Sequence, residues 1–204
     1  MLWKRLCFAA FCLFAAASGA FSPLARAQVL VQRARNDVPA ISRIFPVGIQ
    51  RGRTAEVVVT GERLEGLSGI LGPPGLRLIK VLSVEEKQAK LELEATADAP
   101  PGAFAVHLLC KAGLSNPKLL AIDAWPQTAE QEPNNLPAAA TAVSIPGGVS
   151  AALAPTDLDY YRFEAAAGDQ WAFDVEARRL GSSLTPILTL YDAAGRELRR
   201  TTAP

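Results

Sequence analysis

Apolar residues recur at every second position in short runs along the chain after residue 38. β-branched side chains dominate TAEVVVT (residues 54–60), and charged and apolar side chains alternate in AKLELEAT (89–96). A period of two is typical of β-strands with one buried face, and no long stretch has the 3.6-residue period of a helix. The pattern predicts further strands over residues 41–45, 76–84, 104–110 and 119–123.

Turn sequences separate these runs, among them GPPG at 72–75 and APPG at 99–102. Six or seven short strands at this spacing predict a β-sandwich over residues 28–124. The ordered motifs PVGIQRG, VVVTGERL, APPGAFAVHL and GLSNP between residues 39 and 123 resemble the immunoglobulin-like TIG family. The resemblance implies an immunoglobulin-like sandwich that acts as a spacer or binding unit.

The pattern changes at residues 125–137, WPQTAEQEPNNLP, where proline and asparagine replace most apolar side chains. This composition predicts a linker. Beyond it, over residues 138–204, short β-type runs return between turn residues, so we expect a second β domain and an all-β protein. The expected strands of this domain lie at 142–145, 149–153, 160–165, 171–177 and 184–191.

Five ordered motifs in this second part resemble the bacterial pre-peptidase C-terminal domain. They are EQEPNN (130–135), DLDYYRF (157–163), AAAGD (165–169), VEARRLGS (175–182) and LTLYDAAGREL (188–198). The resemblance implies a β-sandwich of jelly-roll type, carried beside a secreted enzyme or repeated in surface proteins. The closing strands of that family are not found before Pro204, so we expect an incomplete sandwich.

The first 27 residues follow the pattern of a secretory signal peptide. Lys4 and Arg5 precede an apolar stretch over residues 6–21, and Ala25 and Ala27 are small residues suited to cleavage. The alternative is an uncleaved anchor, but the apolar stretch is shorter than the ~20 residues that cross a bilayer as a helix. We therefore expect a secreted, periplasmic or cell-surface protein with no membrane segment after cleavage.

Cleavage would also remove Cys7 and Cys12, leaving Cys110 with no partner for an internal disulfide. The chain has 21 basic and 20 acidic residues, a formal net charge of +1, so no basic excess favours nucleic acid. The single histidine, His107, is an odd number of residues from Cys110, which places the two on opposite faces of a strand. Motifs of metalloproteases, α/β-hydrolases and phosphate-binding loops are absent from the sequence, which predicts a non-catalytic chain.

Acidic and amide side chains gather in the linker and just before one expected strand. Calcium takes about six to eight oxygen ligands, which carboxylates and amide carbonyls supply. The sequence therefore offers a calcium site, and the alternative is a metal-free turn at residues 132–135 with a solvated cap residue at 157. The candidate ligands are Glu130, Glu132, Asn134, Asp157 and Asp159, with Asn135 and Tyr160 beside them.

Collagen-binding domains similar to the pre-peptidase C-terminal family are stabilised by calcium through such a linker. The resemblance extends this role to Glu130, Glu132, Asn134 and Asp159, and less directly to Asp157, because the spacing of the two aspartates varies among relatives. The leading expectation is a non-catalytic accessory or adhesive module whose partner is an extracellular polymer or protein, or further domains of the same chain. The alternatives are the N-terminal part of a secreted peptidase or other hydrolase, and a polysaccharide- or collagen-binding module.

Overall fold

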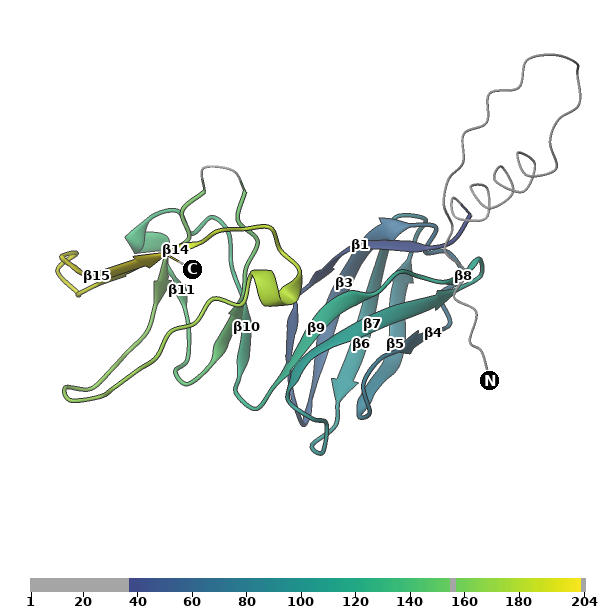
Figure 1. Cartoon of the computed structure of the whole chain (residues 1–204), viewed down its shortest axis with the longest axis horizontal. Helices are drawn as coiled ribbons and strands as arrows, with labels where there is room; N and C mark the ends of the chain where they lie inside the picture. The colour runs from purple at the N-terminus through teal and green to yellow at the C-terminus, as the bar shows by residue number, and fades with distance from the viewer. Residues whose placement is uncertain (1–36, 155–156, 203–204) are drawn as a thin grey trace, which may run out of the picture. The chain divides into compact units, whose positions relative to one another are not determined.

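The computed structural model describes residues 37–154 and 157–202, which belong to one compact unit, Asp37–Pro204 (Figure 1). The expected signal peptide, residues 1–27, lies outside the described residues, as does the start of the first expected domain. No helix in the described part of the chain is long and apolar enough to cross a membrane. Strands and loops make up nearly all of that part, which confirms the all-β fold class.

The first domain consists of two sheets (Figure 1). One has four antiparallel strands in the order β1-β3-β6-β5, and the other has the order β2-β9-β7-β4, with β8 paired to β7. Strand β2 lies at the edge of the second sheet, parallel to β9. The bounds are β1 Ala40–Phe45, β2 Gly48–Gln50, β3 Arg53–Glu62, β4 Gly69–Leu71, β5 Leu76–Val84, β6 Gln88–Ala95, β7 Gly102–Cys110, β8 Gly113–Leu114 and β9 Lys118–Asp123.

The core of this sandwich follows from the period-two pattern. In β6 the residues Ala89, Leu91 and Leu93 are buried, while their alternating neighbours are half-buried. In β7 the core face carries Val106 and Leu108. Every buried hydrophobic side chain of the described residues lies between residues 41 and 122, so the hydrophobic core belongs to this domain alone.

A side-chain bridge holds the first strand to the opposite sheet. The Asn116 side chain accepts a hydrogen bond from the Ile41 backbone N–H at 2.6 Å and donates one to the Ile41 carbonyl at 3.0 Å. The pairing of β1 with β3 shifts register between Ile41 and Arg43. Asn116 therefore completes the hydrogen bonding of a buried residue beside an irregularity in the ladder, and it explains part of the GLSNP motif.

The described residues of the second part of the chain form three two-stranded sheets. Strands β10 and β12 are parallel, β11 and β13 are parallel, and β14 and β15 are antiparallel. Two short 3₁₀ helices, η1 and η2, separate them. The bounds are β10 Gln127–Ala129, η1 Pro137–Ala139, β11 Thr141–Ala142, β12 Gly148–Ser150, β13 Tyr161–Arg162, η2 Arg178–Leu180, β14 Ile187–Tyr191 and β15 Glu197–Thr202.

The sequence prediction needs three corrections in this part. The expected linker contains a strand, β10, because its backbone pairs with β12. The expected strand at 171–177 does not form, and the strands expected at 142–145, 149–153 and 160–165 shorten to two or three residues. The physical reason lies in the packing: Trp171 and Phe173 remain 41% and 45% exposed, so no facing sheet covers their apolar side.

Candidate metal site

Three carboxylates meet where the linker passes the loop before β13. One oxygen of each of Glu130, Glu132 and Asp159 lies within 4.8 Å of the others. Glu130 follows β10, and its N–H donates to the Ser150 carbonyl at 3.0 Å. The Tyr160 N–H donates to the Asn134 carbonyl at 3.0 Å, so backbone bonds join the linker to β12 at Glu130 and to the loop before β13 at Asn134.

Tyr161 bridges two of the carboxylates. Its hydroxyl lies 3.0 Å from Glu130 Oε2 and 3.0 Å from Asp159 Oδ2. A hydroxyl has one proton and donates it to one acceptor at a time. The second carboxylate therefore faces the hydroxyl oxygen with no proton from Tyr161 between them. This contact is favourable only if that carboxylate is itself protonated or a cation lies nearby.

The pKa shifts in the cluster also indicate that its negative charge is poorly compensated. Burial raises the pKa of Glu130, the Asp159 charge adds to the increase, and hydrogen bonds from Tyr161 and the Ala152 N–H oppose it. Burial, followed by the two neighbouring carboxylates, also raises the pKa of the Tyr161 hydroxyl far above its ordinary value. Negative charge is thus unfavourable at this site without a compensating cation.

A fully buried amide side chain lies in the linker, two residues after Glu132. Asn134 is 0% exposed, and neither its side-chain nitrogen nor its side-chain oxygen has a hydrogen-bond partner among the described residues. One carboxylate oxygen of Asp159 is likewise buried and unpartnered there. Burying such a group without a partner costs about 1–3 kcal/mol. The Asn134 N–H donates to Glu132 Oε2 at 2.9 Å, which fixes Asn134 beside the cluster.

The donor set suits a hard cation. Glu130, Glu132 and Asp159 supply carboxylate oxygens, Asn134 supplies an amide oxygen, and two of these residues have oxygens without a partner. Calcium binds oxygen ligands of these two kinds, in flexible geometry. The residues present therefore fit a calcium ion, which would compensate the charge of the three carboxylates.

The structure brings together most, but not all, of the residues proposed from the sequence. Glu130, Glu132 and Asp159 share one cluster and Asn134 lies in its turn, but Asp157 is outside it. The carboxylate of Asp157 instead accepts hydrogen bonds from the Asn135 side chain and the Leu158 N–H. Asp157 therefore fits the alternative interpretation, a residue that caps a turn.

Within the described part of the chain, Tyr160 contacts the site through its backbone only. Tyr160 was the candidate, whereas the hydroxyl at the carboxylates belongs to Tyr161. Asp159 and Tyr161 are two residues apart, and residues two apart in an extended segment share a face. That spacing was the available signal.

The side chains of His107 and Cys110 both make contacts within the first sandwich. The His107 Nδ1 donates to the Ser115 carbonyl at 2.8 Å. Cys110 is 5% exposed on the core face of β7, and burial raises the pKa of its thiol. The half-buried His107 alternates with core residues Val106 and Leu108, which confirms that His107 and Cys110 lie on opposite faces.

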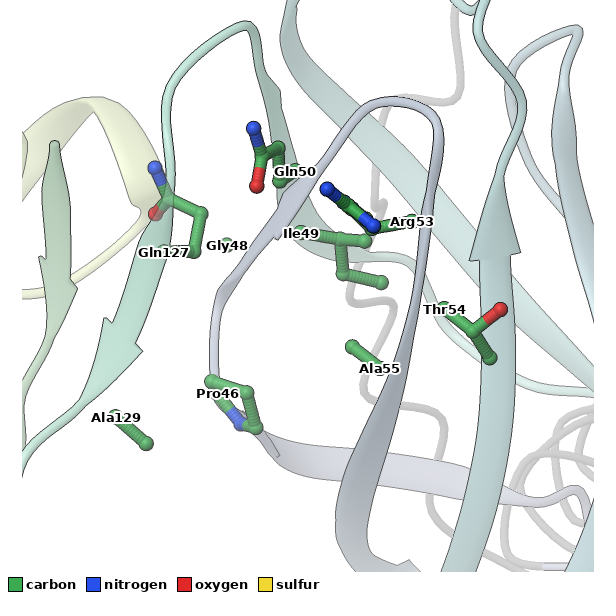
Figure 2. Close-up of a pocket in the computed structure, with 9 residues that line it drawn as sticks. All are labelled: Pro46, Gly48, Ile49, Gln50, Arg53, Thr54, Ala55, Gln127 and Ala129. Atoms are coloured by element: carbon green, nitrogen blue, oxygen red, sulfur yellow. The ribbon is translucent and has the colours of Figure 1, made fainter.

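A small pocket of about 220 Å³ lies beside β2, β3 and β10 (Figure 2). Its apolar wall includes Pro46 and Ile49, and its polar groups include Gln50, Arg53 and Gln127 (Figure 2). Small-molecule pockets usually have about 300–1,000 Å³. The volume of this pocket is below that range, so it does not favour a small-molecule ligand there.

No protein-family model matches the chain, and no curated protein matches it in sequence. Solved structures that match include the SGBP-B protein of the Bacteroides ovatus mixed-linkage glucan utilization locus, in complex with a mixed-linkage heptasaccharide. The two chains are 13% identical with a TM-score of 0.35, over 53% of this chain and 26% of that one. The chain thus spans about a quarter of that protein, and this similarity transfers neither fold nor ligand.

Proposed function

We propose that the chain is an exported, non-catalytic accessory or adhesive module that spaces or targets an extracellular or cell-surface assembly, and that calcium stabilises its second part. The observation that carries the proposal is the meeting of Glu130, Glu132 and Asp159 within 4.8 Å, beside the buried and unpartnered side chain of Asn134. A cation compensates the carboxylates and joins the linker to the loop before β13.

The assignment of residues 130–202 to the pre-peptidase C-terminal type is part of the same proposal. It is supported by the position of the cluster, whose members come from the EQEPNN and DLDYYRF motifs. A non-catalytic role is supported by the state of the two side chains best suited to catalysis. His107 is bonded to a backbone carbonyl and Cys110 is buried in the core.

Calcium titration tests the proposal. Isothermal titration of the exported chain is expected to give binding heat, and calcium is expected to raise the melting temperature. Glu130→Gln removes one carboxylate and should abolish most of the heat, whereas Glu164→Gln, an exposed glutamate in the same part of the chain, should bind as the wild type does. Absence of both heat and thermal shift in the wild-type chain would refute the calcium site.

A polysaccharide-binding role is the second candidate, and the exposed aromatic side chains favour it. Trp125, Trp171 and Phe173 are 54%, 41% and 45% exposed. Aromatic side chains of this kind supply large contact areas in binding sites. Pull-down on insoluble polysaccharides, with Trp171→Ala as the comparison, checks this role: a retained wild-type chain and a released variant support it, and equal recovery of the two contradicts it.

A further inference from the structure

A single buried serine contacts both the first sandwich and the segment that carries the candidate metal site. Ser150 ends β12 and is 1% exposed. Its hydroxyl oxygen accepts hydrogen bonds from the Val47 N–H at 3.0 Å and the Gly48 N–H at 3.1 Å. Its carbonyl accepts the Glu130 N–H at 3.0 Å. The side chain of Ser150 thus holds edge strand β2, while its backbone holds a candidate ligand of the cation.

The Gln127 side chain lies beside Gly48 at this junction (Figure 2), and it also lies against Gly148. A Cβ on Gly48 would lie 2.3 Å from Gln127 Oε1, and a Cβ on Gly148 would lie 2.4 Å from Gln127 Nε2. Neither position accepts a side chain unless Gln127 moves. Gln127 Nε2 also donates to Asp123 Oδ2 at 3.2 Å, so this amide ties β10 to the end of the first sandwich.

The junction and the acidic cluster share Glu130. The residue directly follows β10, which pairs with β12 from Gln127 to Ala129. Its carboxylate accepts a hydrogen bond from the Ala152 N–H, two residues beyond Ser150, and another from Tyr161. A displacement of the Glu130 carboxylate therefore acts directly on the β10–β12 pair, and through this pair on the position of Ser150.

We propose that cation binding at the acidic cluster is coupled to the docking of Ser150 on β2, so that the cation sets the rigidity of the joint between the two parts of the chain. This inference rests on the proposed calcium site. With calcium bound, Glu130 is held between its metal and Ser150, and the Ser150 hydroxyl keeps its bonds to Val47 and Gly48. Without calcium, repulsion among Glu130, Glu132 and Asp159 loosens the β10–β12 pair. Coupling of this kind is reciprocal, so a formed joint also raises the affinity for calcium.

Amide hydrogen exchange, followed by NMR in the exported chain with and without calcium, tests the coupling. Calcium is expected to slow exchange at Val47 and Gly48 by about fivefold or more, the lower end of typical couplings between sites. The Ile41 N–H, bonded to Asn116 in the same sandwich, serves as the internal reference and should not respond. Titration calorimetry on the same samples measures calcium binding independently.

Two variants and one control separate the joint from the site. Ser150→Ala should still bind calcium, with an affinity weakened about fivefold or more, and its Val47 and Gly48 amides should exchange at the same rate with and without calcium. Gly48→Ala displaces the Gln127 amide and leaves the proposed ligands intact, so it should reduce the calcium effect on exchange. Ser144→Ala removes an exposed hydroxyl from the same segment and should behave as the wild type.

The outcomes distinguish the two proposals. Absence of calcium heat in the wild type overturns the calcium site, and the coupling with it. Calcium heat without any change at Val47 and Gly48 overturns the coupling and leaves the site standing. A calcium effect of wild-type size that persists in both Ser150→Ala and Gly48→Ala, with Ile41 still protected, also overturns the coupling.

Discussion

The two parts of the chain are both built of strands, but they are stabilised by different interactions. Between residues 40 and 123, two sheets enclose a core that contains every buried hydrophobic side chain of the described residues. Among the residues described between 127 and 201, those that are buried are Asn134, Thr141 and Ser150, which are all polar. The same alternating pattern therefore produces a closed core in one part and an open surface in the other.

The difference shows that a strand pattern alone does not produce a hydrophobic core. A strand pattern gives each strand an apolar side, and stability follows only where a second sheet covers that side. Polar contacts replace this cover in the second part: Ser150 binds β2, and Tyr161 binds two carboxylates. Such contacts contribute about 1 kcal/mol each, so the second part is the more responsive to a bound cation.

The largest effect is expected from a cavity in the first domain. Leu91 in β6 is 0% exposed, and Leu91→Ala should lower the free energy of unfolding by about 2–5 kcal/mol. The loss comes from buried methyl groups and from the space that they leave. Urea unfolding followed by tryptophan fluorescence and circular dichroism measures it.

The matched change in the second part is Leu198→Ala. Leu198 is 54% exposed in β15, so its truncation should change the free energy of unfolding by less than about 0.5 kcal/mol. Comparable losses for Leu91→Ala and Leu198→Ala would contradict the contrast between a closed and an open part.

Calcium should protect the second part against proteolysis, while β5 and β6 of the first sandwich should not respond to it. At a free concentration one hundred times the dissociation constant, a ligand bound only to the folded state contributes about 2.7 kcal/mol. Trypsin cleavage after Arg162, Arg178 and Arg179 should therefore slow by up to about a hundredfold when calcium is added. Sites at Lys80 and Lys90, in strands of the first sandwich, should stay uncut with or without it.

Mass spectrometry of timed digests reads both sets of sites in one experiment. Glu130→Gln is the control, because without a full set of carboxylates calcium should give no protection. Equal protection by calcium in both parts, or in Glu130→Gln, would show that the ion acts elsewhere in the chain.

The sequence predicted the first domain well because its signals are local. Period-two runs and Pro-Gly turns located six of its strands to within two residues, including Leu76–Val84 without error. The short strands β2, β4 and β8 were missed, because two or three residues show no period. In the second part the same runs gave shorter strands or none, since strand length there depends on a facing sheet that the sequence pattern does not report.

The acidic cluster was predicted in part for a similar reason. Residue types and linker position brought in Glu130, Glu132 and Asp159, which the structure places together. Asp157 and Tyr160 were proposed beside them because spacing alone does not fix which way a loop residue points. The role of Ser150 had no signal in the sequence, since its partners Val47 and Gly48 lie about one hundred residues earlier in the chain.

A smaller loss of stability is expected at the bridge between β1 and the loop before β9. Asn116→Ala leaves the N–H and carbonyl of the buried Ile41 without these partners, which should cost about 1–3 kcal/mol. The measurement is again urea unfolding. Asn135→Ala, whose side chain bonds the partly exposed Asp157, is the matched control and should cost less; equal costs would mean that burial does not govern the difference.

Thiol reactivity compares the two parts most directly, and it is the prediction with the smallest expected change in stability. Cys110 is buried in the first domain, and burial raises the pKa of its thiol, so less reactive thiolate is present at pH 8 than in a free cysteine. Val175→Cys places a second thiol at a position of the second part that is 40% exposed. Reaction with a disulfide reagent should then show a fast phase from position 175 and a slow phase from Cys110. In urea the reaction of Cys110 should become fast as well. A single fast phase in the native protein would mean that the core of the first domain opens as readily as the second part.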